Sequence, residues 1–221
     1  MLCAAPGSIF FKELQMNRTD WDLYYSSPAP TAFFSRAVIR HHLLRLIRKT
    51  GIQQNNSIAE LGGGGSCFCG TIKEKFKIRH YTVYDACESG IREFLRKNPD
   101  SKTVQTDLLK WEPDEKYDLV FSVGLIEHFS EEQTELLISK HFEMTNPGGH
   151  VIIFVPTPTL IYTITRKIAE WFRIWKFPDE RPLEKEEVKK TADFYGILLK
   201  DFTIYSNFLS QYAVLYRKKK P

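Results

Sequence analysis

The sequence lacks the features that mark several classes of protein. Its 221 residues include only four cysteines, Cys3, Cys67, Cys69 and Cys87, whereas a secreted disulfide scaffold is smaller and richer in cysteine. No apolar run approaches the roughly 20 residues that a membrane-spanning helix needs. The N-terminus has no basic region followed by an apolar core, so we expect no secretory signal. These absences predict a protein of the reducing cytoplasm.

An excess of one charge and a set of metal ligands are also missing. The 31 basic and 27 acidic residues leave a net charge of +4, and the basic residues are spread along the chain, so we expect no nucleic-acid partner. The one dense basic run, 217–220, is typical of a solvated end. Cys67 and Cys69 have no second pair and no nearby histidine, and the neighbours His41 and His42 face different directions on a helix. We therefore predict no metal site.

The sequence does contain a regular alternation of strand and helix patterns. Expected strands are 57–61, 79–84, 102–106, 117–123, 150–155, 199–205 and 211–216, and expected helices are 36–49, 67–76, 89–97, 131–143, 160–175 and 184–196. Their alternation is typical of βαβ units. The last two strands are joined by a link too short for a parallel crossover. We predict an α/β fold: a Rossmann-like, mostly parallel seven-stranded sheet with an antiparallel C-terminal hairpin and helices on both faces.

We expect one domain over residues 1–221. It would comprise an N-terminal helical cap (1–50), a cofactor-binding core (51–155), a lid insertion (156–182) and a C-terminal helix with the hairpin (183–221). Residues 1–34 are expected to be irregular because Pro28 and Pro30 break helices, and 146–149 should form a turn.

The expected lid carries a stripe of apolar residues. From Ile161 to Trp175 they recur at spacings of three and four, which indicates a helix that packs as core or as a lid. Tryptophans and basic residues in 160–175 leave peripheral membrane contact open as the alternative.

A glycine-rich turn, 60–66, follows the first strand and reads Glu-Leu-Gly-Gly-Gly-Gly-Ser. Glycines let a ligand approach the backbone, and the next helix offers unpaired N–H groups. No lysine follows until Lys73, so the P-loop pattern is absent. The dinucleotide pattern G-x-G-x-x-G fails at its third position, Cys67, which counts against NAD and FAD.

Acidic residues lie at the ends of three successive strands, Glu60, Asp85 and Asp107. In a doubly wound sheet all three reach the carboxyl edge, where ligands bind. Asp85 is placed to accept hydrogen bonds from ribose hydroxyls and Asp107 from an adenine amine. Glu60 is placed near a ligand ammonium group, or it serves the glycine turn structurally.

These stretches resemble the class I S-adenosylmethionine-dependent methyltransferases in order and spacing. The matching segments are 58–66, 83–85, 106–109, 117–129 and 147–153. One departure is Ser66, where the family often has a glycine. The resemblance implies S-adenosylmethionine as the cofactor, and it implies these cofactor-binding residues: Glu60, Gly62, Gly63, Gly64, Asp85, Ala86, Asp107, Leu108 and Ser122.

The resemblance also implies a methyl transfer, and His128 is the candidate catalytic residue. It follows the fourth strand, and its reference pKa near neutrality suits a general base for a hydroxyl. We expect the acceptor to be a hydroxyl of a small molecule or glycan. A nucleic-acid methyltransferase and a non-catalytic S-adenosylmethionine-binding module remain the alternatives, and the sequence predicts no oligomeric state.

Overall fold

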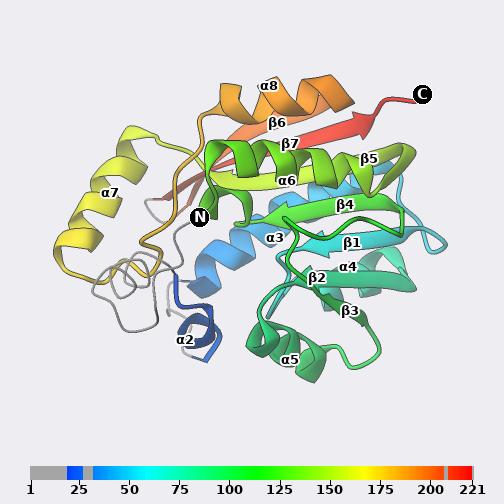
Figure 1. Cartoon of the computed structure of the whole chain (residues 1–221), viewed down its shortest axis with the longest axis horizontal. Helices are drawn as coiled ribbons and strands as arrows, with labels where there is room; N and C mark the ends of the chain where they lie inside the picture. Colours follow the sequence, from blue (N-terminus) through cyan, green and yellow to red (C-terminus); the bar gives the residue numbers. More distant parts are fainter. Residues whose placement is uncertain (1–18, 27–31, 207–208, 221) are drawn as a thin grey trace.

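The computed structural model describes residues 19–26, 32–206 and 209–220. Within them one sheet has the strand order β3-β2-β1-β4-β5-β7-β6 (Figure 1). Its strands are β1 (Ser57–Leu61), β2 (His80–Asp85), β3 (Lys102–Gln105), β4 (Tyr117–Val123), β5 (Thr145–Pro156), β6 (Gly196–Ser206) and β7 (Leu209–Lys218). Only β7 runs against its neighbours, β5 and β6. This arrangement confirms the predicted α/β fold and its reversed last strand.

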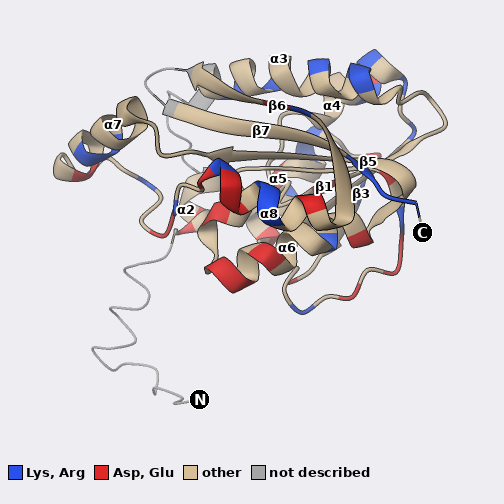
Figure 2. Cartoon of the chain, turned by 90° about the horizontal axis from the view of Figure 1, so that it is seen from above, with Lys and Arg blue, Asp and Glu red and all other residues tan. Residues whose placement is uncertain are grey.

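Helices cover both faces of the sheet, as predicted. They are α2 (Trp21–Ser26), α3 (Ala32–Thr50), α4 (Cys69–Phe76), α5 (Glu88–Lys97), the short 3-10 helix η1 (Ile126–His128), α6 (Glu131–Glu143), α7 (Leu160–Trp171) and α8 (Lys185–Tyr195). Side chains of α3, α4 and α5 pack on one face, and those of α6 and α8 on the other. Figure 2 shows α3 on the opposite side of the sheet from α6 and α8. A hydrophobic core lies on each face of the sheet. Side chains of β4 alternate between the two cores: Leu119 and Phe121 point to one and Val120 to the other.

The turn expected at 146–149 lies inside β5 as an irregularity. Tyr117 pairs with Thr145, but Leu119 pairs with His150. The intervening residues bulge from the ladder, and Gly148 has a φ of +79°. A turn-like conformation does occur at the predicted residues, but β5 already begins before them, at Thr145.

The N-terminal part is more helical than expected. Helix α2 occupies Trp21–Ser26, so the prediction of irregular structure throughout 1–34 is wrong there. Its start is explained by Asp20, whose carboxylate accepts a hydrogen bond from the Leu23 N–H at 2.9 Å, as a capping residue does. Pro28 and Pro30 lie outside the described residues.

Helix α7 differs from its prediction in length and in packing. It ends at Trp171 instead of Trp175, and Arg173 just beyond has a φ of +56°, a left-handed conformation that cannot continue a helix. Ile164, Ile168 and Trp171 are exposed. The reading of this stripe as core is therefore wrong. No helix in the described part of the chain is long and apolar enough to span a membrane.

Candidate active site

The glycine turn after β1 brings the backbone to the carboxyl edge of the sheet. Gly62 has a φ of +67°, and its N–H donates to the Tyr84 carbonyl at 2.8 Å. A side chain at Gly64 would place its Cβ 2.7 Å from a carboxylate oxygen of Asp85. Position 62 needs glycine because of its positive φ, and position 64 needs glycine because the Asp85 carboxylate lies so close to its backbone. The turn therefore holds its backbone in direct contact with Asp85.

Glu60 is buried beneath this turn and anchored by protein groups. The Tyr81 hydroxyl donates to it at 2.5 Å. Burial raises the pKa of Glu60 to about 7, although hydrogen bonds from Tyr81 and Ser66 oppose that rise. Glu60 also lines the cavity described below. Glu60 thus supports the turn structurally, and its role toward a ligand ammonium group stays a prediction.

Asp85 ties the glycine turn to the start of α5. One carboxylate oxygen accepts from the Gly64 N–H and the other from the Cys87 N–H, both at 2.7 Å. Burial raises its pKa, against the effect of these backbone bonds and of a hydrogen bond from Tyr25. The Tyr25 hydroxyl thus occupies one of the acceptor positions that a ligand hydroxyl would use.

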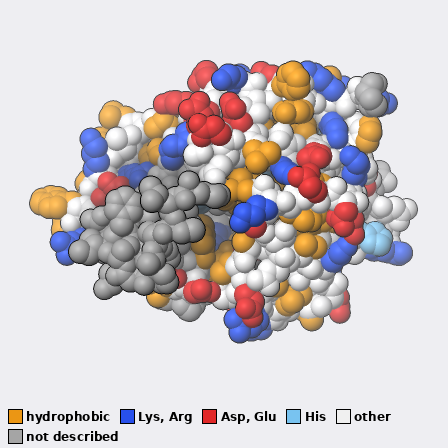
Figure 3. All heavy atoms as spheres, in the orientation of Figure 1, with side chains coloured by type: hydrophobic (Ala, Val, Ile, Leu, Met, Phe, Trp, Pro, Cys, Tyr) orange, Lys and Arg blue, Asp and Glu red, His pale blue; other side chains and the backbone are white. Residues whose placement is uncertain are grey.

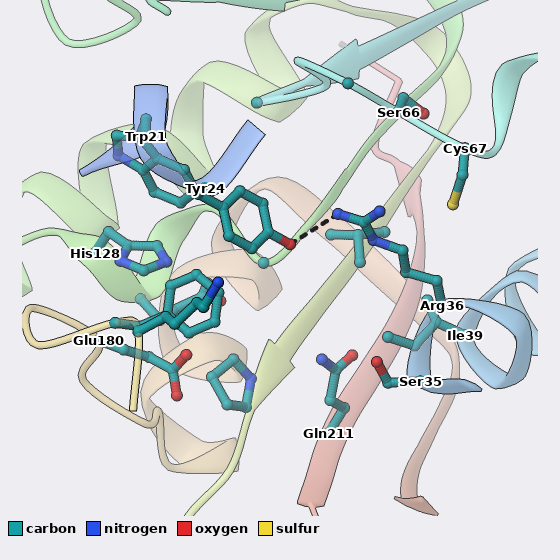
Figure 4. Close-up of a pocket in the computed structure, with 18 of the residues that line it drawn as sticks. Trp21, Tyr24, Ser35, Arg36, Ile39, Ser66, Cys67, His128, Glu180 and Gln211 are labelled. Atoms are coloured by element: carbon teal, nitrogen blue, oxygen red, sulfur yellow. Dashed lines mark hydrogen bonds between the residues drawn. The ribbon is translucent and has the colours of Figure 1, made fainter. Parts of the chain in front are cut away.

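A cavity of about 680 Å³ opens beside the glycine turn. Its walls come from elements far apart in sequence: α2, α3, the glycine turn, η1, α7 and the segment after it. Figure 4 shows His128 and Glu180 on one side and Arg36 on the other, with the Arg36 guanidinium donating to the Tyr24 hydroxyl at 2.8 Å. Of the predicted site residues, five line it: Glu60, Gly62, Gly63, Gly64 and His128.

His128 is held in a fixed orientation at this cavity. Its Nδ1 lies 3.0 Å from an Asp179 carboxylate oxygen, and Trp21 packs edge-on against the ring at 5.0 Å between centroids. Burial would lower the pKa of His128, but the hydrogen bond to Asp179 and the neighbouring carboxylates outweigh burial, and the net shift is upward. Hydrogen bonds from His128 and Thr19 overcome the effect of burial on Asp179 and hold its pKa at about 2.

Two further carboxylates, Glu127 and Glu180, adjoin His128. Glu127 is fully buried, and its Oε2 has no hydrogen-bond partner among the described residues. Burial raises the pKa of Glu127 to about 7, with His128 opposing the shift. Glu180 accepts a hydrogen bond from the Tyr162 hydroxyl of α7. The cavity therefore has an acidic side around one histidine.

The remaining predicted site residues do not line this cavity. Ala86 follows Asp85 at the edge of the site, and Asp107 is exposed and paired with Lys110 at 3.2 Å. The Leu108 side chain packs in the core, which leaves only its backbone for a ligand. Ser122 has no exposed surface, and its hydroxyl meets His141 Nε2 at 2.9 Å. Contrary to the prediction, Ser122 is not available to a ligand.

Sequence reasoning missed several residues that the fold brings to His128. Asp179 is 51 positions from His128, and Glu180 follows it. A Pro-Asp-Glu segment at 178–180 was visible in the sequence, but nothing in its pattern indicated a histidine partner. Glu127 had a better signal, because it directly precedes His128 and adjoins the carboxyl end of β4.

The model of a family described as "Methyltransferase domain" matches residues 34–185. The chain belongs to this methyltransferase family. No curated protein matches the sequence. The fold is similar to N-methyltransferase NodS from Bradyrhizobium japonicum, solved with S-adenosylhomocysteine, at 17% identity and a TM-score of 0.66 over 96% of this chain and 99% of that one.

The methyltransferase is also similar to magnesium protoporphyrin IX methyltransferase from Synechocystis, at 13% identity and a TM-score of 0.72 over 95% of this chain and 97% of that one. The putative sarcosine dimethylglycine methyltransferase of Galdieria sulphuraria is similar at 13% identity and a TM-score of 0.64, over 83% of this chain and 86% of that one. The family match and these folds confirm a class I S-adenosylmethionine-dependent methyltransferase.

The residues present fit the methyl donor. A Cβ at Gly64 would lie 2.7 Å from both an Asp85 carboxylate oxygen and the Tyr25 hydroxyl, so glycine here lets hydrogen-bonding groups reach the carboxylate. Gly62, Gly63 and Gly64 line the cavity next to buried Glu60. S-adenosylmethionine has ribose hydroxyls in its nucleoside part and an ammonium group at its amino-acid end. These groups match the order of Asp85, the glycines and Glu60.

Proposed function

We propose that this methyltransferase acts on a hydroxyl group of a small molecule or glycan, with His128 as the general base. The pairing of His128 with Asp179 is the observation that carries this proposal. A carboxylate that accepts from Nδ1–H fixes the tautomer whose Nε2 is free to take a proton. Glu60, the glycines at 62–64 and Asp85 would bind the donor, while Ala86, Asp107 and the Leu108 backbone would border its adenine.

The donor supplies a methyl group on a positively charged sulfur. The acceptor oxygen forms the new bond to this carbon as the carbon–sulfur bond breaks, and the electron pair of that bond stays on sulfur. His128 Nε2 takes the hydroxyl proton, and Asp179 stabilises the resulting imidazolium. Trp21 and Phe177 flank the histidine ring and exclude water from it. Alignment in a closed cavity can supply much of the rate enhancement, up to ~7–11 kcal/mol.

An amine is the second candidate acceptor. The buried, unpartnered Oε2 of Glu127 favours it, because an ammonium group would satisfy this oxygen. Two of the similar structures are named as N-methylating or sarcosine enzymes. For an amine, His128 would remove a proton from the bound ammonium before transfer.

A donor-labelling experiment tests the acceptor class. The purified protein is incubated with methyl-labelled S-adenosylmethionine and fractions of a cell extract. We expect label in a polar glycan or small-molecule fraction, in a bond that behaves as an ether. Label in an amine would favour the second candidate. Label only in nucleic acid, or no transfer to any fraction, would contradict both.

The pH dependence of Asp179→Asn tests the role of His128. In the wild type, activity should rise with pH through a pKa above the ordinary 6.5 of histidine, because a base must be deprotonated and the neighbouring carboxylates raise this pKa. Asp179→Asn should shift this rise in activity to lower pH and reduce kcat, with little change in the KM for the donor. An unchanged pH profile would show that His128 has only a structural role.

The cytoplasmic location stays a prediction. It is supported by the free thiols of Cys67, Cys69 and Cys87, which a reducing compartment would preserve.

A further inference from the structure

Helix α7 presents an apolar face to solvent. At about 100° per residue, Leu160, Ile164 and Trp171 fall on one side of the helix, and Ile161, Ile168 and Phe172 lie next to them. These six side chains are 47% to 82% exposed. We call these six residues the outer stripe. Figure 3 shows hydrophobic and basic side chains side by side at the left end of the molecule, where α7 lies in Figure 1.

The opposite face of α7 is fixed to the protein. Tyr162 is buried and donates to Glu180, and Arg166 donates to the Glu180 carbonyl at 2.7 Å. Thr165 and Ala169 line the cavity. Because these contacts use the inner face, the outer stripe cannot turn inward without breaking them. The exposure of the stripe therefore belongs to the folded protein.

The charge around the outer stripe is positive. Lys167 and Arg173 are exposed at its edge. The acidic Glu170 is neutralised by Arg166, whose Nε lies 2.7 Å from its carboxylate. A second copy of this chain would bring the same cations against this strip. An anionic surface with an apolar interior complements both the charge and the stripe.

We propose that the outer stripe of α7 docks on an anionic lipid bilayer. The helix lies parallel to the surface, its apolar side chains enter the boundary between headgroups and acyl chains, and Lys167 and Arg173 meet the lipid phosphates. Trp171 sits at the depth that tryptophan favours. Because the inner face lines the cavity, docking holds the catalytic cavity next to the membrane. The docking itself does not depend on which acceptor the enzyme methylates.

Vesicle flotation of the full chain tests this surface. Vesicles of phosphatidylcholine with phosphatidylglycerol should carry the protein, and pure phosphatidylcholine should carry at least tenfold less. Ile164→Glu with Ile168→Glu should abolish flotation, and Lys167→Glu with Arg173→Glu should weaken it at least tenfold. Ile197→Glu on β6, an exposed apolar position away from α7, is the matched control and should float like the wild type.

Two measurements accompany flotation. Tryptophan fluorescence should shift to the blue on anionic vesicles, and Trp171→Phe should remove most of that shift while preserving the donor affinity. Circular dichroism verifies that the glutamate variants are folded. The proposal is overturned if folded wild type stays off anionic vesicles or if the glutamate pair floats normally. It is also overturned if sedimentation finds a dimer that Ile164→Glu dissociates, since a second copy would then cover the stripe.

Discussion

Asp85 satisfies hydrogen-bond donors from two elements at once, and this double use makes it the residue on which donor binding should depend most. Its two oxygens accept from Gly64 and Cys87, and Tyr25 donates to it as well. A ribose would replace the Tyr25 hydroxyl while the backbone bonds persist. The aspartate thereby shapes the site before any ligand arrives.

We expect Asp85→Ala to weaken S-adenosylmethionine binding at least tenfold, which corresponds to about 1.4 kcal/mol. Asp85→Asn should weaken it less, because the amide oxygen can keep one backbone bond. Isothermal calorimetry measures both, and Asp100→Ala, at an exposed turn, is the control. Unchanged affinity in a folded Asp85→Ala protein would remove this residue from the donor site.

Residues whose signal is local could be found in the sequence, and those defined by distant contacts could not. Gly62 and Gly64 come within three residues of the end of β1 and Asp85 is the last residue of β2, so their positions at the sheet edge follow from the strand pattern. Asp179 lies beside His128 because the segment after α7 returns to η1, and no local sequence pattern indicates that return. The prediction for Ser122 was wrong because the pattern of β4 does not indicate that the Ser122 side chain faces His141.

At the scale of elements, capping explains where prediction succeeded. Helix α6 begins where expected, because Ser130 and Gln133 form a capping box: the Ser130 hydroxyl accepts from the Gln133 N–H, and the Gln133 side chain accepts from the Ser130 N–H at 3.3 Å. Helix α7 ended early because Arg173 adopts a left-handed conformation that its residue type does not announce.

Ser130→Ala should lower the free energy of unfolding by about 1 kcal/mol, because an N-terminal N–H of α6 loses its acceptor. Urea unfolding at neutral pH measures the change. Ser139→Ala, a half-buried serine in the same helix whose hydroxyl does not cap it, is the control and should change stability by less than half as much. Equal losses in the two variants would mean that the capping box contributes nothing specific. The cap also matters for the site, because Ser130 lies two residues after the end of η1, which carries Glu127 and His128.

For the whole molecule, buried titratable groups make stability depend on pH. His141 is fully buried; its Nδ1–H donates to the Leu137 carbonyl and its Nε2 accepts from Ser122. Burial lowers its pKa to about 4, against the effect of the bond to Leu137. The unfolded chain, with an ordinary pKa near 6.5, binds this proton first. The contribution of His141 is therefore complete above pH 6.5 and is lost as pH falls toward 4.

We predict that the free energy of unfolding of the wild type falls relative to His141→Phe between about pH 6.5 and pH 4, by at most about 1.4 kcal/mol per pH unit. Glu60 and Glu127, with pKa values raised to about 7 by burial, act in the opposite direction in both proteins. The difference between the two curves therefore isolates His141. His80→Gln, at an exposed position, should follow the wild type. Parallel curves for wild type and His141→Phe would refute the prediction.

The position of β7 in the sheet sets an order of events during synthesis. β7 lies between β5 and β6 and, among the described residues, is the one strand that pairs with β6. It is also the last of the seven strands to leave the ribosome. Until it emerges, β5 and β6 have open edges, and the apolar residues of β7 at 213–216, which serve both cores, are missing. The glycine turn and Asp85 are synthesised long before this, but Ser210 and Gln211 of β7 line the cavity beside them, so the cavity is complete only after β7 has joined the sheet.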